Sequence, residues 1–210
     1  MEDLKQIMPK KLGFGCMRLP VANGNSEEID DVVFSRMIDR YMEQGFVYFD
    51  TAYPYHNQKS EEAVRRCLVE RYDRERFLLA DKMPVWLVQN TEDYSEIFER
   101  QLARCGVTYF DFYLLHAMNK TRVEETEKTG GFAFVQRMKT EGRIRHIGFS
   151  FHDTAEALEE ILKNHPEMEF VQLQINYYDW ESENVQSRKC YEVAKKYGVP
   201  VIVMEPVKGG

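Results

Sequence analysis

Strand-like and helix-like segments alternate along nearly the whole of this 210-residue sequence. The strand-like segments are short apolar or aromatic runs, and the helix-like segments repeat apolar residues every three or four positions. We predict strands at 12–19, 46–49, 77–80, 110–115, 144–150, 170–175 and 199–204. We predict helices at 26–42, 60–70, 91–104, 132–140, 153–163 and 182–197, and a long polar loop at 119–131. This alternation predicts a parallel sheet with right-handed crossovers.

Two architectures satisfy that pattern, an open doubly wound sheet and a closed (β/α)8 barrel. The open fold would carry a GxGxxG fingerprint after its first strand, but Gly13-Phe14-Gly15 lies inside the strand and no third glycine follows at the required place. Candidate chemical groups instead follow the ends of consecutive strands, which is typical of a barrel. We therefore predict an α/β fold of the (β/α)8 TIM-barrel type that forms one domain, 1–210. It is incomplete, because the sequence ends after the seventh strand and the eighth is missing.

Composition restricts the setting and the partners. With 43% hydrophobic residues, the chain can bury a core, and no run approaches the roughly 18 apolar residues of a membrane span. Its four cysteines are widely spaced, so neither a disulfide framework nor a metal site is predicted, and a cytoplasmic location is expected. A formal charge of −7 argues against binding to nucleic acid or to an anionic membrane. We expect a small-molecule partner, and self-association through the open barrel edges.

Four residues at predicted strand ends form a plausible catalytic set: Asp50, Tyr55, Lys82 and His116. A free tyrosine has a pKa of about 10, and a neighbouring ammonium would lower that pKa by stabilising the phenolate. An aspartate would hold the lysine, and a histidine could donate a hydrogen bond to a carbonyl oxygen. The set suits proton donation to an oxygen that becomes negative, as in carbonyl reduction by hydride. Tyr53 is an alternative acid, although the spacing favours Tyr55.

These residues also occur in a recognisable order. Asp50-Thr-Ala-x-x-Tyr55, Lys82 after a strand, Leu-Leu-His116 and Gly142-Arg-Ile-Arg-His-Ile-Gly148-Phe-Ser150 together resemble the aldo-keto reductase superfamily. The resemblance implies a (β/α)8 barrel that reduces an aldehyde or ketone with NADPH, or alternatively NADH, and without a metal. It also implies that Tyr55 is the general acid, Lys82 its activator, Asp50 the partner of the lysine, and His116 the group that places the carbonyl.

The same resemblance assigns part of a nicotinamide site. Ser150 and Gln172 match the residues that hydrogen-bond the nicotinamide carboxamide, and Met204 stands where an aromatic residue usually covers the ring. Phe151 replaces an expected asparagine. Gly-Phe-Ser-Phe-His-Asp and the final Met-Glu-Pro-Val-Lys-Gly-Gly resemble a bacterial subgroup with a C-terminal ferredoxin-like segment. A 4Fe-4S cluster is therefore expected only in such a missing segment, and full cofactor affinity only in a chain extended through strand eight.

Other interpretations stay open on the sequence alone. The barrel could be a non-catalytic nucleotide-binding or regulatory module, or a different barrel enzyme such as a lyase or hydrolase. The absence of a paired-carboxylate motif or a metal-ligand cluster in the sequence argues against the latter. Trp86 follows Lys82 closely and could form a pocket wall.

Overall fold

Seven strands form one sheet in which consecutive strands of the chain are hydrogen-bonded neighbours, in the order β1 to β7. The computed structural model describes residues 7–8, 10–25 and 28–208. Parallel pairing joins β1 to β2, β2 to β3, β5 to β6 and β6 to β7. The strands are β1 (Phe14–Gly15), β2 (Tyr48–Asp50), β3 (Leu78–Met83), β4 (Phe110–Met118), β5 (Ile144–Phe151), β6 (Phe170–Gln174) and β7 (Val201–Met204). All seven predicted strands are confirmed, although β1 is much shorter than predicted.

Seven α-helices connect these strands in the described part of the chain. They are α2 (Asp31–Glu43), α3 (Ser60–Val64), α4 (Thr91–Cys105), α5 (Lys120–Thr129), α6 (Gly131–Thr140), α7 (Ala155–Asn164) and α8 (Ser187–Lys196). Helix α3 continues directly into a π-helical turn, η2 (Arg65–Val69). The six predicted helices are confirmed in type, and the differences lie at their ends and in one additional helix.

The additional helix is α5, which occupies most of the stretch predicted to be a polar loop. Asn119 caps it, since its side-chain oxygen accepts the backbone N–H of Arg122 at 2.9 Å. The helix ends at Gly130, which adopts a left-handed conformation with φ 85°. The prediction of a loop was wrong because a charged helix with a single buried residue, Thr126, has almost no apolar period to detect.

Two predicted helix starts also need correction. The N-cap of α2 is Asp30, whose side chain accepts the N–H groups of Val32 and Val33 at 3.1 and 2.9 Å. The predicted first residue of this helix, Ser26, and the following Glu27 lie outside the described residues. Helix α8 begins at Ser187 and not at Ser182, because turns occupy the intervening stretch and Gln186 adopts a left-handed conformation with φ 55°.

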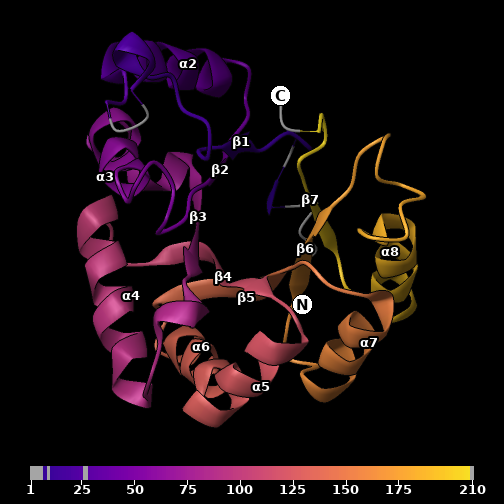
Figure 1. Ribbon diagram of the computed structural model, residues 1–210. Helices are drawn as coiled ribbons and strands as arrows, with labels where there is room; N and C mark the ends of the chain where they lie inside the picture. The colour runs from indigo at the N-terminus through magenta and orange to yellow at the C-terminus, as the bar shows by residue number, and fades with distance from the viewer. Residues whose placement is uncertain (1–6, 9, 26–27, 209–210) are drawn as a thin grey trace. The chain divides into compact units, whose positions relative to one another are not determined.

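The chain divides into two compact units. The first contains residues 1–84 and 92–112, with β1, β2, β3 and the start of β4; α2, α3 and α4 lie to one side of its strands (Figure 1). Its core is rich in aromatic rings, including Phe14 stacked on Phe49 with centroids 5.6 Å apart. Such rings supply most of the buried apolar area in a core of this kind.

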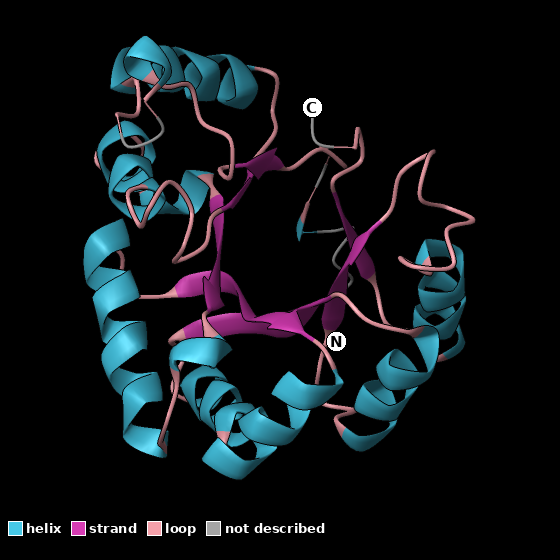
Figure 2. Cartoon of the chain, viewed as in Figure 1, coloured by secondary structure: helices cyan, strands magenta, loops and turns pink. Residues whose placement is uncertain are grey.

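The second unit contains residues 85–91 and 113–210, with the rest of β4 and strands β5 to β7. Helices α5 to α8 lie to one side of these strands (Figure 2). Strand β5 is buried along almost its whole length. Apart from the exposed Arg145, residues on both faces of this strand are buried, as expected for a strand of a parallel sheet that is covered by helices.

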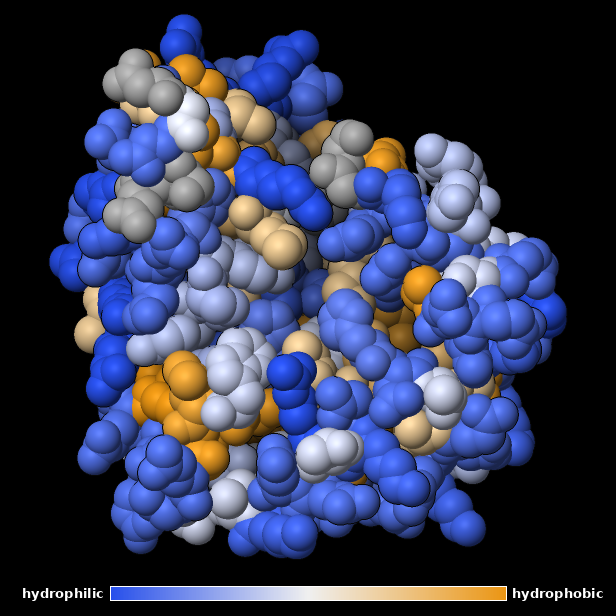
Figure 3. All heavy atoms as spheres, viewed as in Figure 1, coloured by the Kyte–Doolittle hydropathy of each residue, from blue (hydrophilic) through white to orange (hydrophobic). Residues whose placement is uncertain are grey.

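Polar side chains dominate one face of the molecule. The face drawn in Figure 3 is mostly hydrophilic, with hydrophobic atoms gathered in a few patches. Within the described ranges, the helices lack the combined length and apolar character that crossing a membrane requires.

Gly148 marks a point of very close packing between β5 and β6, and its replacement by alanine is expected to destabilise the fold. An added Cβ would lie 2.5 Å from the backbone oxygen of Phe170 and 2.7 Å from its ring. We expect Gly148→Ala to lower the free energy of unfolding by about 3 kcal/mol, as overpacking does. Gly15→Ala is the matched control, because its Cβ would meet nothing within 4 Å. Urea unfolding compares the two, and equal midpoints would contradict this description of the strand pair.

Candidate active site

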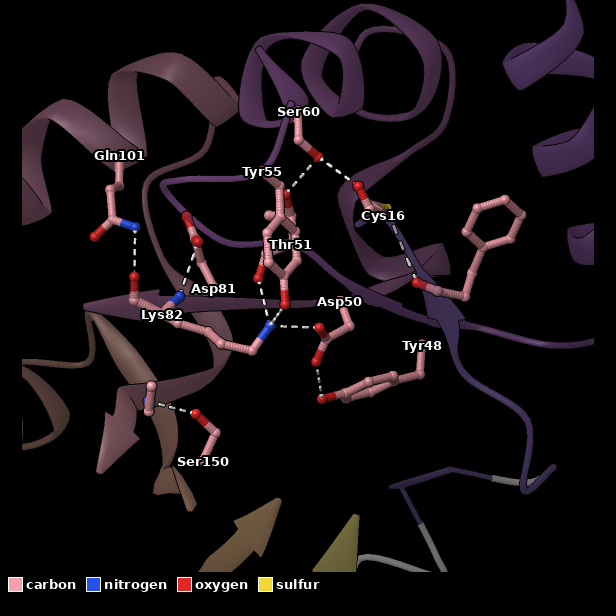
Figure 4. A network of polar contacts seen from close by, with 12 residues as sticks. Cys16, Tyr48, Asp50, Thr51, Tyr55, Ser60, Asp81, Lys82, Gln101 and Ser150 are labelled. Carbon is pink, nitrogen blue, oxygen red and sulfur yellow. Dashed lines mark hydrogen bonds and ion pairs between the residues drawn. The ribbon is translucent and has the colours of Figure 1, made fainter. Parts of the chain in front are cut away.

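A buried lysine, itself one of the four predicted catalytic residues, joins two of the others within the first unit (Figure 4). Lys82, in β3, is 1% exposed. Its Nζ donates hydrogen bonds to Asp50 Oδ1 at 2.5 Å, to the Thr51 carbonyl at 2.8 Å and to the Tyr55 hydroxyl at 3.2 Å. These three bonds use all three ammonium protons. The structure therefore brings Asp50, Lys82 and Tyr55 together as predicted from the sequence.

Tyr55 lies in a turn that directly follows β2. Asp50 is the last residue of β2, and the chain then turns through Tyr55 to His56, Asn57 and Gln58. These last three residues all lie in the left-handed region, with φ of 49°, 50° and 69°. Consecutive non-glycine residues in that region are strained, and such strain tends to occur at functional sites. The turn is held in part by His56, whose Nε2 accepts the N–H of Leu19 at 2.8 Å.

Burial, rather than the lysine, controls the acidity of Tyr55. Burial raises the pKa of Tyr55, the Lys82 ammonium lowers it and the Asp50 carboxylate raises it, and the net direction is upward. The expected effect of the lysine is thus present, but the expected net lowering of the tyrosine pKa is wrong. Burial lowers the pKa of Lys82, yet Asp50 and Tyr55 raise it more, so the lysine remains an ammonium. The site holds a protonated phenol beside a permanent positive charge.

A second layer of polar groups fixes the backbone of Lys82. Asp81 Oδ1 accepts the Lys82 N–H at 2.8 Å, and Gln101 Nε2 donates to the Lys82 carbonyl at 3.0 Å. Gln101 also donates to Glu61 Oε1 at 3.1 Å, and Arg104 donates to Glu61 Oε2 at 3.1 Å. The side chains of Glu61 and Asp81 are fully buried, and burial is the largest cause that raises the pKa of each. No pattern in the sequence predicts this layer.

The remaining predicted site residues belong to the second unit. His116 lies in β4, and Ser150 in β5 is the register partner of Gln172 in β6. Ser150 Oγ accepts the N–H of Ala117 at 2.7 Å, directly beside His116 in the chain. Met204, the last residue of β7, is half-buried. The structure thus places His116, Ser150 and Gln172 on three consecutive strands.

An aromatic side chain lies against His116. Trp86, in the short 3-10 helix η4 (Val85–Leu87), has its ring centroid 5.1 Å from that of His116. The guanidinium carbon of Arg122 lies 5.1 Å from the Trp86 ring centroid. The prediction that Trp86 could line a pocket stays open, whereas Arg122 was not considered because its stretch was predicted to be a loop.

The described residues contain no group of three or more His, Cys, Asp or Glu side chains placed to hold a metal ion. Cys16, Cys67, Cys105 and Cys190 are all buried free thiols. Burial raises the pKa of each thiol, which keeps the four cysteines protonated and unreactive at neutral pH.

Comparison with known proteins identifies the family. The sequence model of the aldo/keto reductase family matches residues 11–210. The chain belongs to the aldo/keto reductase family. The glyoxal reductase of Bacillus subtilis strain 168 is 29% identical over 153 residues, which cover 72% of this chain and 49% of the reductase. The chain therefore corresponds to about half the length of that relative.

Solved structures agree with this assignment. The holo form of an aldo-keto reductase from Bacillus halodurans superposes with a TM-score of 0.69 at 26% identity, over 95% of this chain and 63% of that one. A thermostable aldo-keto reductase crystallised with the inhibitor epalrestat gives a TM-score of 0.73 at 23% identity, over 95% and 69%. The predicted fold, an incomplete (β/α)8 barrel of the aldo-keto reductase type, is confirmed.

Proposed function

We propose that this chain carries the catalytic part of an NAD(P)H-dependent oxidoreductase that reduces aldehydes or ketones to alcohols. The observation that carries this proposal is the buried Lys82 ammonium bonded to both Asp50 and the Tyr55 hydroxyl. Membership of the aldo/keto reductase family supports the same reaction class. The glyoxal reductase relative suggests small aldehydes as substrates.

Tyr55 acts as the general acid in this proposal. Its raised pKa keeps the phenol protonated at neutral pH, so a proton is available for a carbonyl oxygen that becomes negative during reduction. The phenolate that remains is stabilised by the ammonium of Lys82, 3.2 Å from the hydroxyl oxygen. Asp50 keeps that ammonium in place. His116 donates a hydrogen bond that orients the carbonyl.

The residues on β5 to β7 fit a nicotinamide ring. Ser150 Oγ already accepts the Ala117 N–H, so its own hydrogen remains to donate to a carboxamide oxygen. Gln172 is the register partner of Ser150 on β6, and its side-chain amide is the second group that we propose to hydrogen-bond the carboxamide. Met204 can cover a ring face with its thioether. NADPH, when bound, supplies the hydride.

The test is NADPH oxidation with glyoxal, for the full chain and two tyrosine variants. Tyr55→Phe is expected to lower kcat by about 100- to 10,000-fold, the typical contribution of a general acid. Tyr53→Phe is the matched control: Tyr53 is buried, its hydroxyl lies 3.4 Å from Arg100 Nη1, and its removal should change kcat less than about threefold.

Retained activity in Tyr55→Phe, or loss only in Tyr53→Phe, would overturn the assignment of the acid. If the chain binds NADPH but reduces no aldehyde, a non-catalytic nucleotide-binding module becomes the better description.

A further inference from the structure

Arg122 lies in the second unit, beside the residue proposed to orient the substrate carbonyl. Its guanidinium sits over the face of Trp86, and Trp86 in turn lies against His116. We infer that Arg122 binds the carboxylate of an anionic substrate, so that the preferred substrates are short aldehydes or ketones that also carry a carboxylate. This inference rests on the proposed function, which it makes more specific.

Two contacts hold the arginine in this position. Arg122 is the third residue of α5, and its backbone N–H is fixed by the capping side chain of Asn119 at 2.9 Å. Its Nη1 donates to the Ala117 carbonyl at 2.6 Å. Because Ala117 directly follows His116, the guanidinium is anchored to the same piece of backbone as the imidazole. Arg122 is therefore positioned relative to His116 before any substrate binds.

The bonding capacity of the guanidinium is mostly unused. An arginine has five N–H donors, and in the described part of the chain Arg122 uses one of them on the Ala117 carbonyl. Nε and Nη2 form the opposite edge, and two parallel donors of that kind match the two oxygens of a carboxylate. The described residues place no carboxylate in an ion pair with this guanidinium. The carboxylate of an incoming substrate would accept hydrogen bonds from these unused donors and pair with the guanidinium.

Trp86 provides the surface between the two polar ends. Trp86 is 39% exposed, so part of it can be reached by a ligand. The Trp86 ring centroid is 5.1 Å from both the imidazole centroid and the guanidinium carbon, so these two lie within about 10 Å of each other. A short carbon chain can cover that distance, with its carbonyl at His116, its carbons on the indole and its carboxylate at Arg122.

The net negative charge of the chain makes Arg122 important for the binding of an anion. The chain carries a formal charge of −7, which disfavours anions in general. A guanidinium in the first turn of α5 adds to the positive end of that helix and creates a local exception. Neutral aldehydes would gain the contact with Trp86 but not the paired hydrogen bonds.

The first experiment compares succinate semialdehyde with its methyl ester, which has the same aldehyde but no charge. Arg122→Leu is expected to lower kcat/KM for succinate semialdehyde by about 10- to 100-fold, the loss that follows removal of a charged hydrogen-bond partner. The methyl ester should change less than about threefold. Arg122→Lys keeps the positive charge but not the two parallel N–H donors, so its kcat/KM for succinate semialdehyde should lie between those of the parent chain and Arg122→Leu. Lys128→Gln is the matched control, since it removes one charge from the last turn of the same helix.

A second experiment does not depend on turnover. The chain has two tryptophans, so Trp180→Phe leaves Trp86 as the single indole reporter. Succinate, which is not reduced, should change the Trp86 fluorescence, whereas the neutral succinamide should not. Adding Arg122→Leu should weaken succinate binding at least about tenfold.

The outcomes separate the two proposals. Equal losses for succinate semialdehyde and its ester in Arg122→Leu, or no loss with either, would overturn the role of Arg122 while the reductase stands. If no aldehyde is reduced but succinate binding still depends on Arg122, the reductase proposal fails and the anion site stands. If succinate does not perturb Trp86 in the parent chain, the anion site is refuted.

Discussion

Lys82→Met is expected to lower kcat for aldehyde reduction by about 100- to 1,000-fold, the loss found when one preorganised electrostatic group is removed. The same change should lower the free energy of unfolding by about 3–5 kcal/mol, because it leaves one partner of a buried ion pair without its counter-charge. Asp50 is only 9% exposed, and in the variant it would lose the ammonium that lies 2.5 Å from its Oδ1. Steady-state kinetics and urea unfolding measure the two effects separately.

The double variant Lys82→Met/Asp50→Asn distinguishes the catalytic role of the lysine from its structural role. Removing both charges eliminates the unpaired carboxylate, so most of the lost stability should return. Activity should not return, because no ammonium remains to stabilise the Tyr55 phenolate. A double variant that regained activity along with stability would show that Lys82 supports only the fold. A single variant with normal kcat would contradict the mechanism directly.

The sequence alone identified the residues at the ends of short apolar runs. Asp50 and Lys82 stand at the ends of apolar runs, and in a parallel sheet such ends meet at one edge, so local pattern was sufficient for them. Tyr55 required more, because it lies in the turn that follows β2, and no periodicity indicates where a side chain in that turn lies. Tyr55 was assigned from the ordered spacing of residues that resembles the aldo-keto reductase superfamily.

Other parts of the site depend on long-range packing that sequence patterns do not record. Glu61 and Gln101 are polar residues on helices, and the expectation for such residues is exposure. Only the folded chain shows that both are buried. Arg122 was missed for the opposite reason, since its helix has too few apolar residues to be recognised. The predicted direction of the Tyr55 pKa shift was wrong for a similar reason. Neighbouring charges can be inferred from the sequence, but the extent of burial cannot.

Asp81 is expected to remain protonated in the folded protein at neutral pH. Its carboxyl group and that of Glu61 are hydrogen-bonded to each other. Two carboxylates can only accept hydrogen bonds, so this contact requires one proton between them. Arg104 and Gln101 both donate to Glu61, which favours the charged form there. The proton therefore belongs on Asp81, where burial and the negative charge of Glu61 raise the pKa well above its usual value.

This assignment predicts how stability depends on pH. An aspartate in the unfolded chain has a pKa of about 3.9, so between that pH and the raised pKa the folded state binds one more proton than the unfolded state. The contribution of Asp81 to the unfolding free energy is full below about pH 4. It is lost as the pH rises, by about 1.4 kcal/mol per pH unit, until the folded pKa is reached. Groups whose pKa is lowered, such as Glu169 with a pKa of about 2, change the unfolding free energy only at lower pH.

Asp81→Asn tests this directly, because an asparagine can donate to Glu61 with its amide and still accept the Lys82 N–H with its oxygen. The variant should fold, and its unfolding free energy should lack the downward slope that the parent chain shows as the pH rises above about 4. Asp39→Asn is the matched control, since Asp39 is partly exposed, is paired with Arg71 and has a lowered pKa, so it should leave that slope unchanged.

Infrared spectroscopy provides an independent check on the proton. The folded parent chain should show the carbonyl stretch of a protonated carboxylic acid at neutral pH, and Asp81→Asn should remove it. If the unfolding free energies of the parent and of Asp81→Asn have equal pH slopes and no such band is present, the carboxyls of Asp81 and Glu61 are both ionised. The network behind Lys82 then contains two negative charges with no proton between them. If the band is present and the slopes differ as expected, the backbone of the catalytic lysine is held by a group that must keep its proton. Activity should then decline at alkaline pH in the parent chain earlier than in Asp81→Asn.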